Sequence, residues 1–419
     1  MSLFKLPRIL KRTRRAPARL FISIGMGENQ LPLIREARAL GFRVIGVDRD
    51  TRAFAATHCD LKIQESIENF AEIFTHLEDI SVYGDIRGVL SKSYGPAVRT
   101  ASYIANMLGF PMFPSRRMDD FIVKKRMKEV FQAGGIPSPE YLVVETSARG
   151  AAGAARLGFP LVVKPVTGHA KTGVRMVTSR RELQRFAGSI RGKGAGFIAE
   201  RFVEGDEIIA LGIIHGRTFH LASLSDKETT PAPYFVDLLH VTPSRHHALW
   251  TEVTAIGQRI AEAFEIEFSP LVIEMRVDSR QGIQVIEAVP EFGGECLPDH
   301  LVPLATGYNF LEQAVRAATG MTFTPPPARA PRLAVAVKYL TADKGRLLSL
   351  DTRAPRGVPG IVYSRFFKAL GAEVGPPADN HDRIGVIVAK GRTREAALDA
   401  AALAARACAV TVGRGGSEK

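Results

Sequence analysis

The sequence from Leu271 to Glu295, LVIEMRVDSRQGIQVIEAVPEFGGE, predicts two neighbouring strands that each hold a carboxylate. Glu274 and Glu287 each follow an apolar run, and residues 279–282 between them have the composition of a hairpin turn. Two carboxylates that face one point repel each other unless a cation neutralises them. Mg²⁺ prefers such oxygen ligands and fills its other positions with water and substrate phosphates. Taken alone, the hairpin is equally consistent with two carboxylates at the rim of an antiparallel pair.

A lysine at the end of an apolar strand lies upstream of this hairpin. Residues 159–165, FPLVVKP, place Lys164 at the strand's end, and the glycine-containing segment 167–174, TGHAKTGV, follows it. A point charge and turn amides both satisfy phosphate oxygens, so this pair suits phosphate binding. The spacing differs from that of a Walker loop. An ordinary hairpin with a solvated Lys171 remains the alternative.

A second apolar strand also ends in an acid. Residues 197–207, FIAERFVEGDE, place Glu200 on the strand and Glu207 beyond a short apolar linker. Such a linker can offer backbone groups to the edge of an adenine, while a carboxylate accepts hydrogen bonds from ribose hydroxyls. The segment therefore predicts a nucleotide-binding linker.

Taken in chain order, these residues resemble the ATP-grasp superfamily. The set comprises Lys124, Lys164, the loop 168–174, the segment 200–207 and the Glu274 and Glu287 pair. The resemblance is strongest to L-amino-acid ligases and carbamoyl-phosphate-synthetase-type domains, with biotin carboxylase and D-alanine–D-alanine ligase as more distant relatives. It extends from residue 20 to about residue 412.

The resemblance implies roles for these residues. The phosphates of the nucleotide would bind Lys124 and Lys164 beneath a flexible loop that includes Gly168, His169, Lys171 and Gly173. The adenine would lie against Glu200 and Val203, with Phe202 in the same linker, and the ribose against Glu207. Mg²⁺ would be held by Glu274 and Glu287. ATP and Mg²⁺ are therefore the expected cofactors.

The second metal strand departs from the family pattern. Members commonly read Glu-x-Asn-x-Arg, whereas this chain reads Glu287-Ala288-Val289-Pro290-Glu291. Residues two apart on a strand share a face, so Val289 and Glu291 are expected to face the site. An apolar group cannot coordinate a metal, which puts one metal position in doubt. Glu295, after the glycine pair, is a candidate substitute ligand.

Catalytic roles are expected for two charged residues near this departure. Arg276 lies two residues after Glu274 and could supply the missing positive charge. A salt bridge from Arg276 to Asp278 or Glu287 is its equally weighted alternative. Glu291 is expected to bind the amine of an amino-acid-like substrate. A salt bridge to Arg276 is the alternative for Glu291.

Length and composition agree with a multidomain enzyme. A chain of 419 residues is expected to form about three domains, and 46% hydrophobic residues suffice for several cores. No apolar run reaches the ~18 residues that a bilayer span needs. The three cysteines are scattered and show no metal spacing. A reducing cytoplasm is the expected compartment.

The net charge of +13 is concentrated at one end of the chain. Residues 1–20 contain Lys5, Arg8, Lys11, Arg12, Arg14, Arg15 and Arg19 and no acid. Such a run is usually a solvated, mobile tail, so no nucleic-acid partner is expected. Contact with an anionic surface or partner is the minority alternative. The tail lacks the apolar region and cleavage site of a secretory signal.

The segment after the tail predicts an open parallel sheet. A strand at 20–24, a helix at 31–40 and a strand at 42–48 form a β-α-β unit, with Gly25-Met26-Gly27 in the first turn. A nicotinamide enzyme is the rival reading, but the third glycine of its fingerprint is absent. In the family this domain contributes to the second substrate's pocket. Residues 48–49 and 91–95 would lie there, with solvated loops as the favoured alternative.

The expected fold class is a multidomain combination of α/β and α+β units with an ATP-grasp centre. A basic tail at 1–19 precedes an N-terminal parallel α/β domain at 20–122. The ATP-grasp domain follows at 123–325, with a small lobe at about 123–204 and a large lobe at about 205–325. A helix is expected from Met118 to Gly134. A small C-terminal α+β domain at 326–419 is expected to contain strands at 333–340 and 384–388 and a helix at 394–407.

Lys227 and His240 lie between the linker and the two strands that hold Glu274 and Glu287. Lys227 could contact phosphates, and His240 could orient the acceptor substrate. A satisfied histidine in a surface loop is the favoured reading of His240.

The predicted function is that of an ATP-dependent carboxylate ligase. A substrate carboxylate would attack the γ-phosphate, and an amine would capture the resulting acyl phosphate. The expected partners are small-molecule carboxylate and amine substrates, without nucleic acid or a membrane span, and a homodimer is a state common among relatives. One alternative is a carboxylase-type relative that activates bicarbonate. Another is a nucleotide-binding protein that has lost catalysis, which Val289 and Glu291 motivate.

Overall fold

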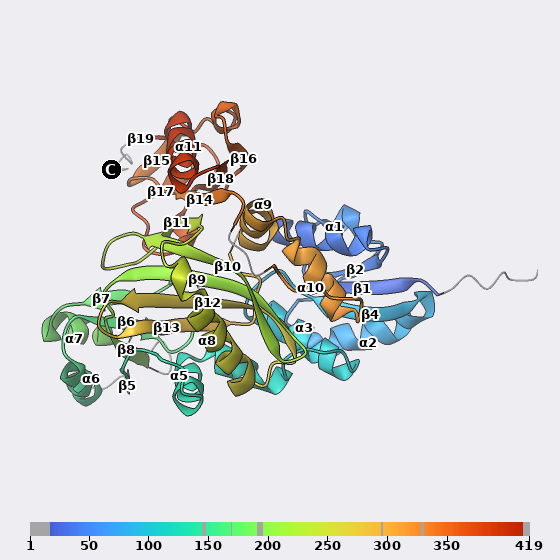
Figure 1. Cartoon of the computed structure of the whole chain (residues 1–419), viewed down its shortest axis with the longest axis horizontal. Helices are drawn as coiled ribbons and strands as arrows, with labels where there is room; N and C mark the ends of the chain where they lie inside the picture. The colour runs from blue at the N-terminus through green and yellow to red at the C-terminus, as the bar shows by residue number, and fades with distance from the viewer. Residues whose placement is uncertain are drawn as a thin grey trace, which may run out of the picture.

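The computed structural model describes residues 17–144, 148–168, 170–190, 196–294, 296–327 and 331–413. Within these residues the strands form four sheets (Figure 1). His169, Glu295 and most of the predicted basic tail lie outside the described residues. None of the helices in the described part of the chain combines the length and the apolarity that a bilayer span requires.

The N-terminal region is an open parallel sheet, as predicted. Its strands lie in the order β3-β2-β1-β4, and all three pairings are parallel. Its elements are β1 (Arg19–Ile24), α1 (Leu31–Ala39), β2 (Arg43–Val47), β3 (Leu61–Ile63), α2 (Phe70–Ile80), β4 (Asp85–Leu90) and α3 (Pro96–Met107). Strand β1 is buried beyond its first residue, as expected of a central strand that helices cover on both faces. Gly25, with φ of 99°, makes the turn after it.

The predicted single helix from Met118 to Gly134 is wrong, because it consists of two helices. They are α4 (Met118–Ile122) and α5 (Lys124–Ala133). Val123 between them has extended backbone angles, φ −89° and ψ 103°. A β-branched residue fits this extended break better than a helix interior. As a result, Lys124 occupies the first turn of α5, and its backbone N–H donates to the carbonyl of Val166 over 2.9 Å.

A small antiparallel sheet follows, in the order β5-β8-β6-β7. Its strands are β5 (Tyr141–Val144), β6 (Leu161–Pro165), β7 (Arg175–Val177) and β8 (Phe197–Arg201), and the helices beside it are α6 (Ala148–Ala154) and α7 (Arg180–Ser189). Leu161, Val163 and Phe197 pack with Leu183 of α7 into a separate buried cluster. This sheet therefore has its own core, and Lys164 lies near the end of one of its central strands.

The large sheet has eight strands in the order β13-β12-β9-β10-β11-β14-β18-β16. Their bounds are β9 (Asp206–His215), β10 (Thr218–Thr229), β11 (Asp237–Thr242), β12 (Phe268–Asp278), β13 (Gly282–Val289), β14 (Ala334–Leu340), β16 (Ile361–Phe366) and β18 (Gly385–Gly391). The predicted hairpin at 279–282 is confirmed, because it joins the antiparallel strands β12 and β13. Glu274 and Glu287 lie directly opposite each other in this register.

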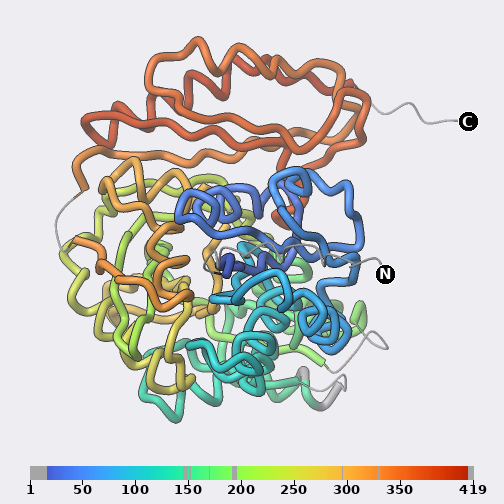
Figure 2. The backbone as a smooth tube through the Cα atoms, turned by 90° about the vertical axis from the view of Figure 1, so that its right-hand side faces the viewer, coloured from blue at the N-terminus to red at the C-terminus, as the bar shows by residue number. Residues whose placement is uncertain are grey.

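The C-terminal strands continue the large sheet. Strand β14 pairs with β11 of the central region, and β18 and β16 extend the sheet beyond it. Helix α11 (Arg394–Ala407), which has the predicted bounds, packs on β14 and β18. A minor sheet of β15 (Gly345–Ser349), β17 (Glu373–Val374) and β19 (Thr411–Gly413) lies beside them. Figure 2 shows this part of the chain as a layer along one side of the molecule.

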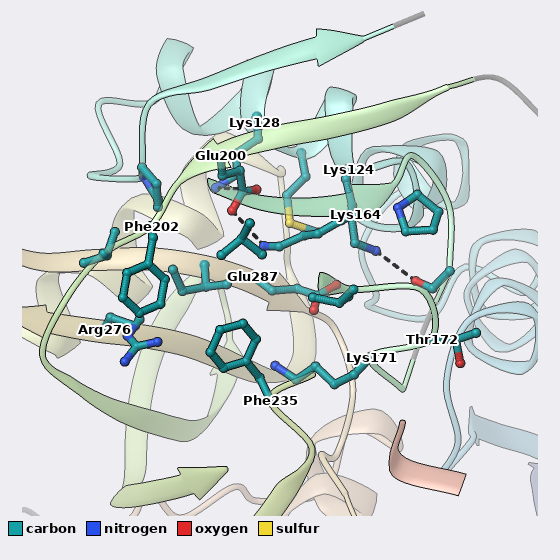
Figure 3. A pocket seen from close by; sticks show the side chains of 18 of the residues that line it. Lys124, Lys128, Lys164, Lys171, Thr172, Glu200, Phe202, Phe235, Arg276 and Glu287 are labelled. Atoms are coloured by element: carbon teal, nitrogen blue, oxygen red, sulfur yellow. Dashed lines mark hydrogen bonds and ion pairs between the residues drawn. The ribbon is translucent and has the colours of Figure 1, made fainter. Parts of the chain in front are cut away.

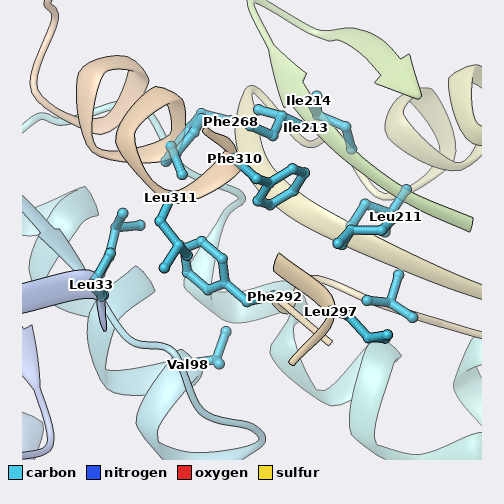
Figure 4. Close-up of a cluster of buried hydrophobic side chains, with 14 of the residues drawn as sticks. Leu33, Val98, Leu211, Ile213, Ile214, Phe268, Phe292, Leu297, Phe310 and Leu311 are labelled. Atoms are coloured by element: carbon cyan, nitrogen blue, oxygen red, sulfur yellow. The ribbon is translucent and has the colours of Figure 1, made fainter. Parts of the chain in front are cut away.

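One apolar core joins the N-terminal sheet to the large sheet (Figure 4). Helix α10 (Phe310–Ala318) lies between them, after helix α9 (Val302–Thr306), while helix α8 (Trp250–Ala263) packs on β10. Phe310 and Leu311 meet Phe268 of β12 and Leu33 of α1 in the same cluster. Burying each such side chain contributes about 1.5–3 kcal/mol. This shared core holds the N-terminal domain beside strands β12 and β13.

Candidate active site

A cavity lies between the small sheet and the large sheet, with about 890 Å³ of empty space that includes open solvent at its mouth (Figure 3). Most of the predicted nucleotide residues line it, together with Arg276 and Glu287. Those residues are Lys124, Lys164, Gly168, Lys171, Glu200, Phe202, Val203 and Glu207. Gly173 does not line it and serves the turn instead, since its φ is 73° and a Cβ there would come within 2.8 Å of Pro165. Residues distant in sequence thus meet around one space, which we call the nucleotide cavity.

Two lysines share one buried carboxylate in this cavity. Lys164 Nζ lies 2.7 Å from one oxygen of Glu200, and Lys128 Nζ lies 3.4 Å from the other. Burial alone would raise the pKa of Glu200, but Lys128 and Lys164 hold it below its ordinary value. Burial lowers the pKa of Lys128 to about 8, although Glu200 opposes the change. The trio keeps an excess of positive charge when all three are ionised, which suits a phosphate.

Lys128 was absent from the sequence-based set. It lies one helical turn after Lys124 on α5, and residues four apart on a helix share a face. That spacing was the available signal. The side chain of Glu200 is engaged by both lysines, so the structure gives it a role in orienting ammonium groups. Its expected contact with adenine stays a prediction.

Aromatic side chains form the opposite end of the nucleotide cavity. The rings of Phe202 and Phe235 stack with centroids 6.0 Å apart, and the Arg276 guanidinium lies 4.8 Å from the centroid of Phe202. Arg276 Nη2 also donates to the carbonyl of Gly205 over 2.7 Å. Neither expected salt bridge of Arg276, to Asp278 or to Glu287, is present in the described part of the chain. Arg276 therefore lies beside the linker in this structure.

Glu274 is engaged by two lysines. Lys171 Nζ and Lys227 Nζ each lie 3.0 Å from one of its oxygens. Burial would raise the pKa of Glu274, but Lys171 and then Lys227 lower it to about 2. Lys227 also pairs with Asp237 at 2.9 Å. Lys171 thus faces a carboxylate rather than solvent, and Lys227 lies beneath Glu274 as part of a buried ion cluster.

Glu274 and Glu287 could bind Mg²⁺ only together with a ligand that supplies further oxygen atoms. Glu287, opposite Glu274, lines the cavity and has no ion pair among the described residues. No group of three or more acidic, histidine or cysteine side chains in the described ranges could hold a metal. One or two carboxylates completed by phosphates and water are the usual Mg²⁺ environment. The donor set therefore fits a metal that arrives with a nucleotide.

A second cavity, with about 2210 Å³ of empty space that includes open solvent, adjoins the first. Gly168, Lys171 and Glu287 line both cavities, and the second extends to Tyr94 and Gly95 of the N-terminal domain. Glu274, Val289, Glu291, Asn380 and Arg383 also line it. The boundary between the cavities is therefore formed by the loop after β6, which we call the phosphate loop for its predicted role, and by strand β13, which with β12 makes up the predicted metal strands.

Glu291 faces the second cavity with one hydrogen-bond donor. The Gly95 N–H donates to its Oε1 over 3.2 Å, and no salt bridge to Arg276 is present in the described residues. Burial raises the pKa of Glu291 to about 8, with Glu287 and Glu274 adding to the rise and Gly95 opposing it. The alternative of an Arg276 partner for Glu291 is therefore wrong for this structure.

Two expectations about surface loops are also wrong. Lys92, in the turn 91–95, is only 1% exposed, and its Nζ donates to Asn29 over 2.8 Å and lies 3.4 Å from Asp299. His240 lies on strand β11, 3% exposed, and burial lowers its pKa to about 4. Both residues lie where elements from different domains meet, which local sequence does not reveal.

Comparisons with known proteins identify two domains. Residues 157–299 match the family model described as ATP-grasp domain, and residues 338–413 match the one described as L-amino acid ligase C-terminal domain 2. The crystal structure of an L-amino acid ligase from Bacillus licheniformis has a TM-score of 0.79 and 20% identity, with 96% of this chain and 100% of that chain covered. The ATP-grasp fold and the family resemblance expected from the sequence are confirmed.

Curated relatives match over shorter stretches. An uncharacterised protein of Sinorhizobium fredii, y4rH, is 27% identical over 332 residues, with 75% of this chain and 66% of that protein covered. A D-alanine–D-alanine ligase of Ralstonia pickettii is 35% identical over 85 residues, with 20% of this chain and 26% of that protein covered. The chain thus spans less than two thirds of the length of these relatives.

Proposed function

Since the chain contains an ATP-grasp domain followed by an L-amino acid ligase C-terminal domain, we propose that it is an ATP-dependent carboxylate–amine ligase. The main support is the convergence of lysines, apolar linker and carboxylates on one cavity. Helix α5, the loop after β6, strand β8, the linker to β9 and the β12–β13 hairpin each contribute to it. Such convergence suits binding of one ligand with an aromatic end and an anionic end.

The nucleotide would lie lengthwise in its cavity. Figure 3 shows Phe202, Phe235 and Arg276 at one end and Lys124 and Thr172 at the other. A base fits the aromatic end because rings stack on rings. Phosphates fit the other end, where Lys124 Nζ donates to the Gly168 carbonyl over 2.9 Å and would hold the loop over them. This orientation brings the terminal phosphate towards the metal strands.

Phosphoryl transfer would take place at the boundary between the cavities. Bound Mg²⁺, held by Glu274 and Glu287, would neutralise the phosphate oxygens during transfer. Lys164 would bind the same phosphates, and Lys171, whose Nζ lies 3.0 Å from Glu274, is close enough to add a second positive charge. A substrate carboxylate attacks the γ-phosphorus, ADP leaves, and an acyl phosphate forms. An amine then attacks the acyl carbon and releases phosphate.

The second cavity would hold the carboxylate substrate and the amine. It adjoins the loop and Glu287, and Gly95 of the N-terminal domain also lines it. Among the described residues, the partner of the Glu291 side chain in this space is the backbone N–H of Gly95. We propose that Glu291 binds a positively charged amine of an amino-acid-like substrate, since a cation would offset the cost of the buried carboxylate.

A protein that binds nucleotide without turnover is the competing proposal. It is favoured by Val289 and Glu291, which stand where the family commonly has a metal-binding amide and an arginine. A carboxylate–amine ligase could still function with Val289 and Glu291 at these positions if Glu291 binds the amine substrate. The competing proposal predicts tight MgATP binding and no product.

One experiment separates the two proposals. The purified protein is incubated with MgATP and a panel of amino acids, singly and in pairs, and ADP release and amide products are measured by mass spectrometry. A ligase gives ADP and amide in equal amounts, and Glu287→Gln loses both. ATP binding without ADP release across the panel would favour the protein that has lost catalysis.

A further inference from the structure

We infer that Asp379 and Asn380, in the C-terminal region, are positioning residues that hold residues 170–172 of the phosphate loop in their observed conformation. The inference rests on the proposed function for its chemical meaning, while the contacts stand on their own. These residues precede strand β18 and begin a short 3-10 turn, residues 380–382. Neither belongs to the segment that matches the ATP-grasp family model.

Two hydrogen bonds join this segment to the loop. The backbone N–H of Asn380 donates to the carbonyl of Ala170 over 3.0 Å. The Thr172 hydroxyl donates to Asp379 Oδ2 over 3.1 Å, across 207 residues of sequence. Ala170 and Lys171 have positive φ angles, 55° and 66°, which non-glycine residues adopt only where their surroundings enforce them. The C-terminal contacts are part of that enforcement.

Two more hydrogen bonds join Asn380 to the ion cluster. Its side-chain Nδ2 donates to Asp237 Oδ2 over 2.8 Å, and its Oδ1 accepts from the Asp237 backbone N–H over 3.0 Å. A side-chain amide has an NH₂ group that donates and a carbonyl oxygen that accepts, and each of them makes one of these bonds. Asn380 is therefore fixed on strand β11 and presents its own N–H to the loop.

The contacts form a closed ring that includes Glu274. From Asn380 the ring passes through Asp237, Lys227 and Glu274 to Lys171, which is the neighbour of Ala170 in the loop. Asn380 then closes the ring through the Ala170 carbonyl. A change at Glu274, such as the arrival of a metal, therefore acts on the same loop that the C-terminal segment restrains.

The segment itself is rigid enough to act as a clamp. Asp379 accepts from the His381 N–H over 2.8 Å, and Asp382 accepts from the Asp379 N–H over 3.2 Å, a reciprocal capping box. A preorganised loop binds its ligand more tightly because less ordering remains to be done. The C-terminal region would thus set the affinity for nucleotide from outside the ATP-grasp domain.

Hydrogen exchange of the ligand-free protein tests the clamp directly. The double variant Asp379→Ala/Asn380→Ala removes the side chains that form three of the hydrogen bonds described above. The amides of residues 170–173 are expected to exchange about tenfold faster or more than in the wild type. Glu373→Gln, an exposed change in the same region, is the matched control. Equal exchange in the double variant and the wild type overturns the inference.

A milder variant covers the case in which the double variant folds poorly. Thr172→Val removes one hydroxyl from the loop side and keeps the side chain's shape. It is expected to accelerate exchange of residues 170–173 while the melting temperature stays within the range of the control. If Thr172→Val leaves exchange unaltered and the double variant is unfolded, the inference is rejected.

Nucleotide binding supplies the second readout. The dissociation constant for MgADP, measured by calorimetry, is expected to rise about tenfold in the folded double variant, as loss of preorganising hydrogen bonds predicts. An unaltered constant overturns this inference alone. Failure of the wild type to bind MgADP overturns the proposed function, and the exchange result still decides whether the clamp exists.

Discussion

The two adjoining cavities differ in how their charges are balanced. In the nucleotide cavity the acid Glu200 already has its partners, because Lys164 and Lys128 lie 2.7 and 3.4 Å from its oxygens. In the second cavity Glu291 has a backbone N–H and no cation in the described residues. Under the proposed function, the surplus positive charge of the first cavity would bind phosphates, and Glu291 would bind the cationic group of an amine in the second.

The largest effect is expected at the phosphates. Lys164→Ala removes the ammonium that would bind them, and Glu287→Gln removes a carboxylate that we propose holds Mg²⁺. Electrostatic groups of this kind contribute several kcal/mol to transfer barriers, so each change is expected to lower kcat for ADP release by at least ~100-fold. Lys125→Ala, an exposed neighbour on α5, is the control. Near-native turnover in either folded variant would remove these residues from the site.

A selective effect is expected in the second cavity. Glu291→Gln should raise KM for the amine-bearing substrate about tenfold or more, because a charged hydrogen bond is lost, and should leave KM for ATP unchanged. Glu68→Gln, an exposed acid that lines the same cavity, is the matched control. If both KM values stay constant while stability falls, Glu291 serves only to hold Gly95, and the contrast between the cavities is lost.

The pH dependence of stability provides a smaller, ligand-free test. The pKa of Glu291 rises from 4.5 to about 8 on folding, mainly through burial, so the folded protein holds a proton that the unfolded chain has released. The contribution of Glu291 to stability should therefore fall as pH rises from about 4.5 to about 8, and Glu291→Gln should lack this contribution. Thermal unfolding in EDTA measures this. Parallel profiles for variant and wild type would show that Glu291 is ionised in the folded state.

The smallest effect is expected for the basic tail. Deleting residues 2–16 removes six basic residues while it leaves Ala18, whose carbonyl accepts from the Asp85 N–H over 2.8 Å. Neither cavity loses a described lining residue, so kcat should change little. A large fall in kcat at an unaltered melting temperature would show that the tail reaches a cavity.

The elements and residues that a local sequence pattern marks could be predicted from the sequence. An apolar run marks the strand that ends at Lys164, and turn residues between two apolar runs mark the hairpin at 279–282. An alanine-rich stretch marks helix α11. The parallel N-terminal sheet followed from its β-α-β order.

The remainder depends on contacts between distant segments. The ion pairs of Glu274 with Lys171 and Lys227 join three segments, and the burial of Lys92 depends on Asn29 and Asp299. Asn380 meets the loop across more than half of the described chain. A single sequence contains no signal for such partners, because hydrogen bonds between distant residues have no period.

The pairing of β11 with β14 bears on how the chain can be divided into fragments. The two family matches end and begin at residues 299 and 338, which invites expression of each part alone. A fragment that stops at residue 325 would leave β11, from Asp237 to Thr242, as a bare edge with Leu239 and Val241 uncovered on it. Exposed strand edges with apolar side chains recruit other chains. Separate expression of the ATP-grasp part should therefore yield aggregates.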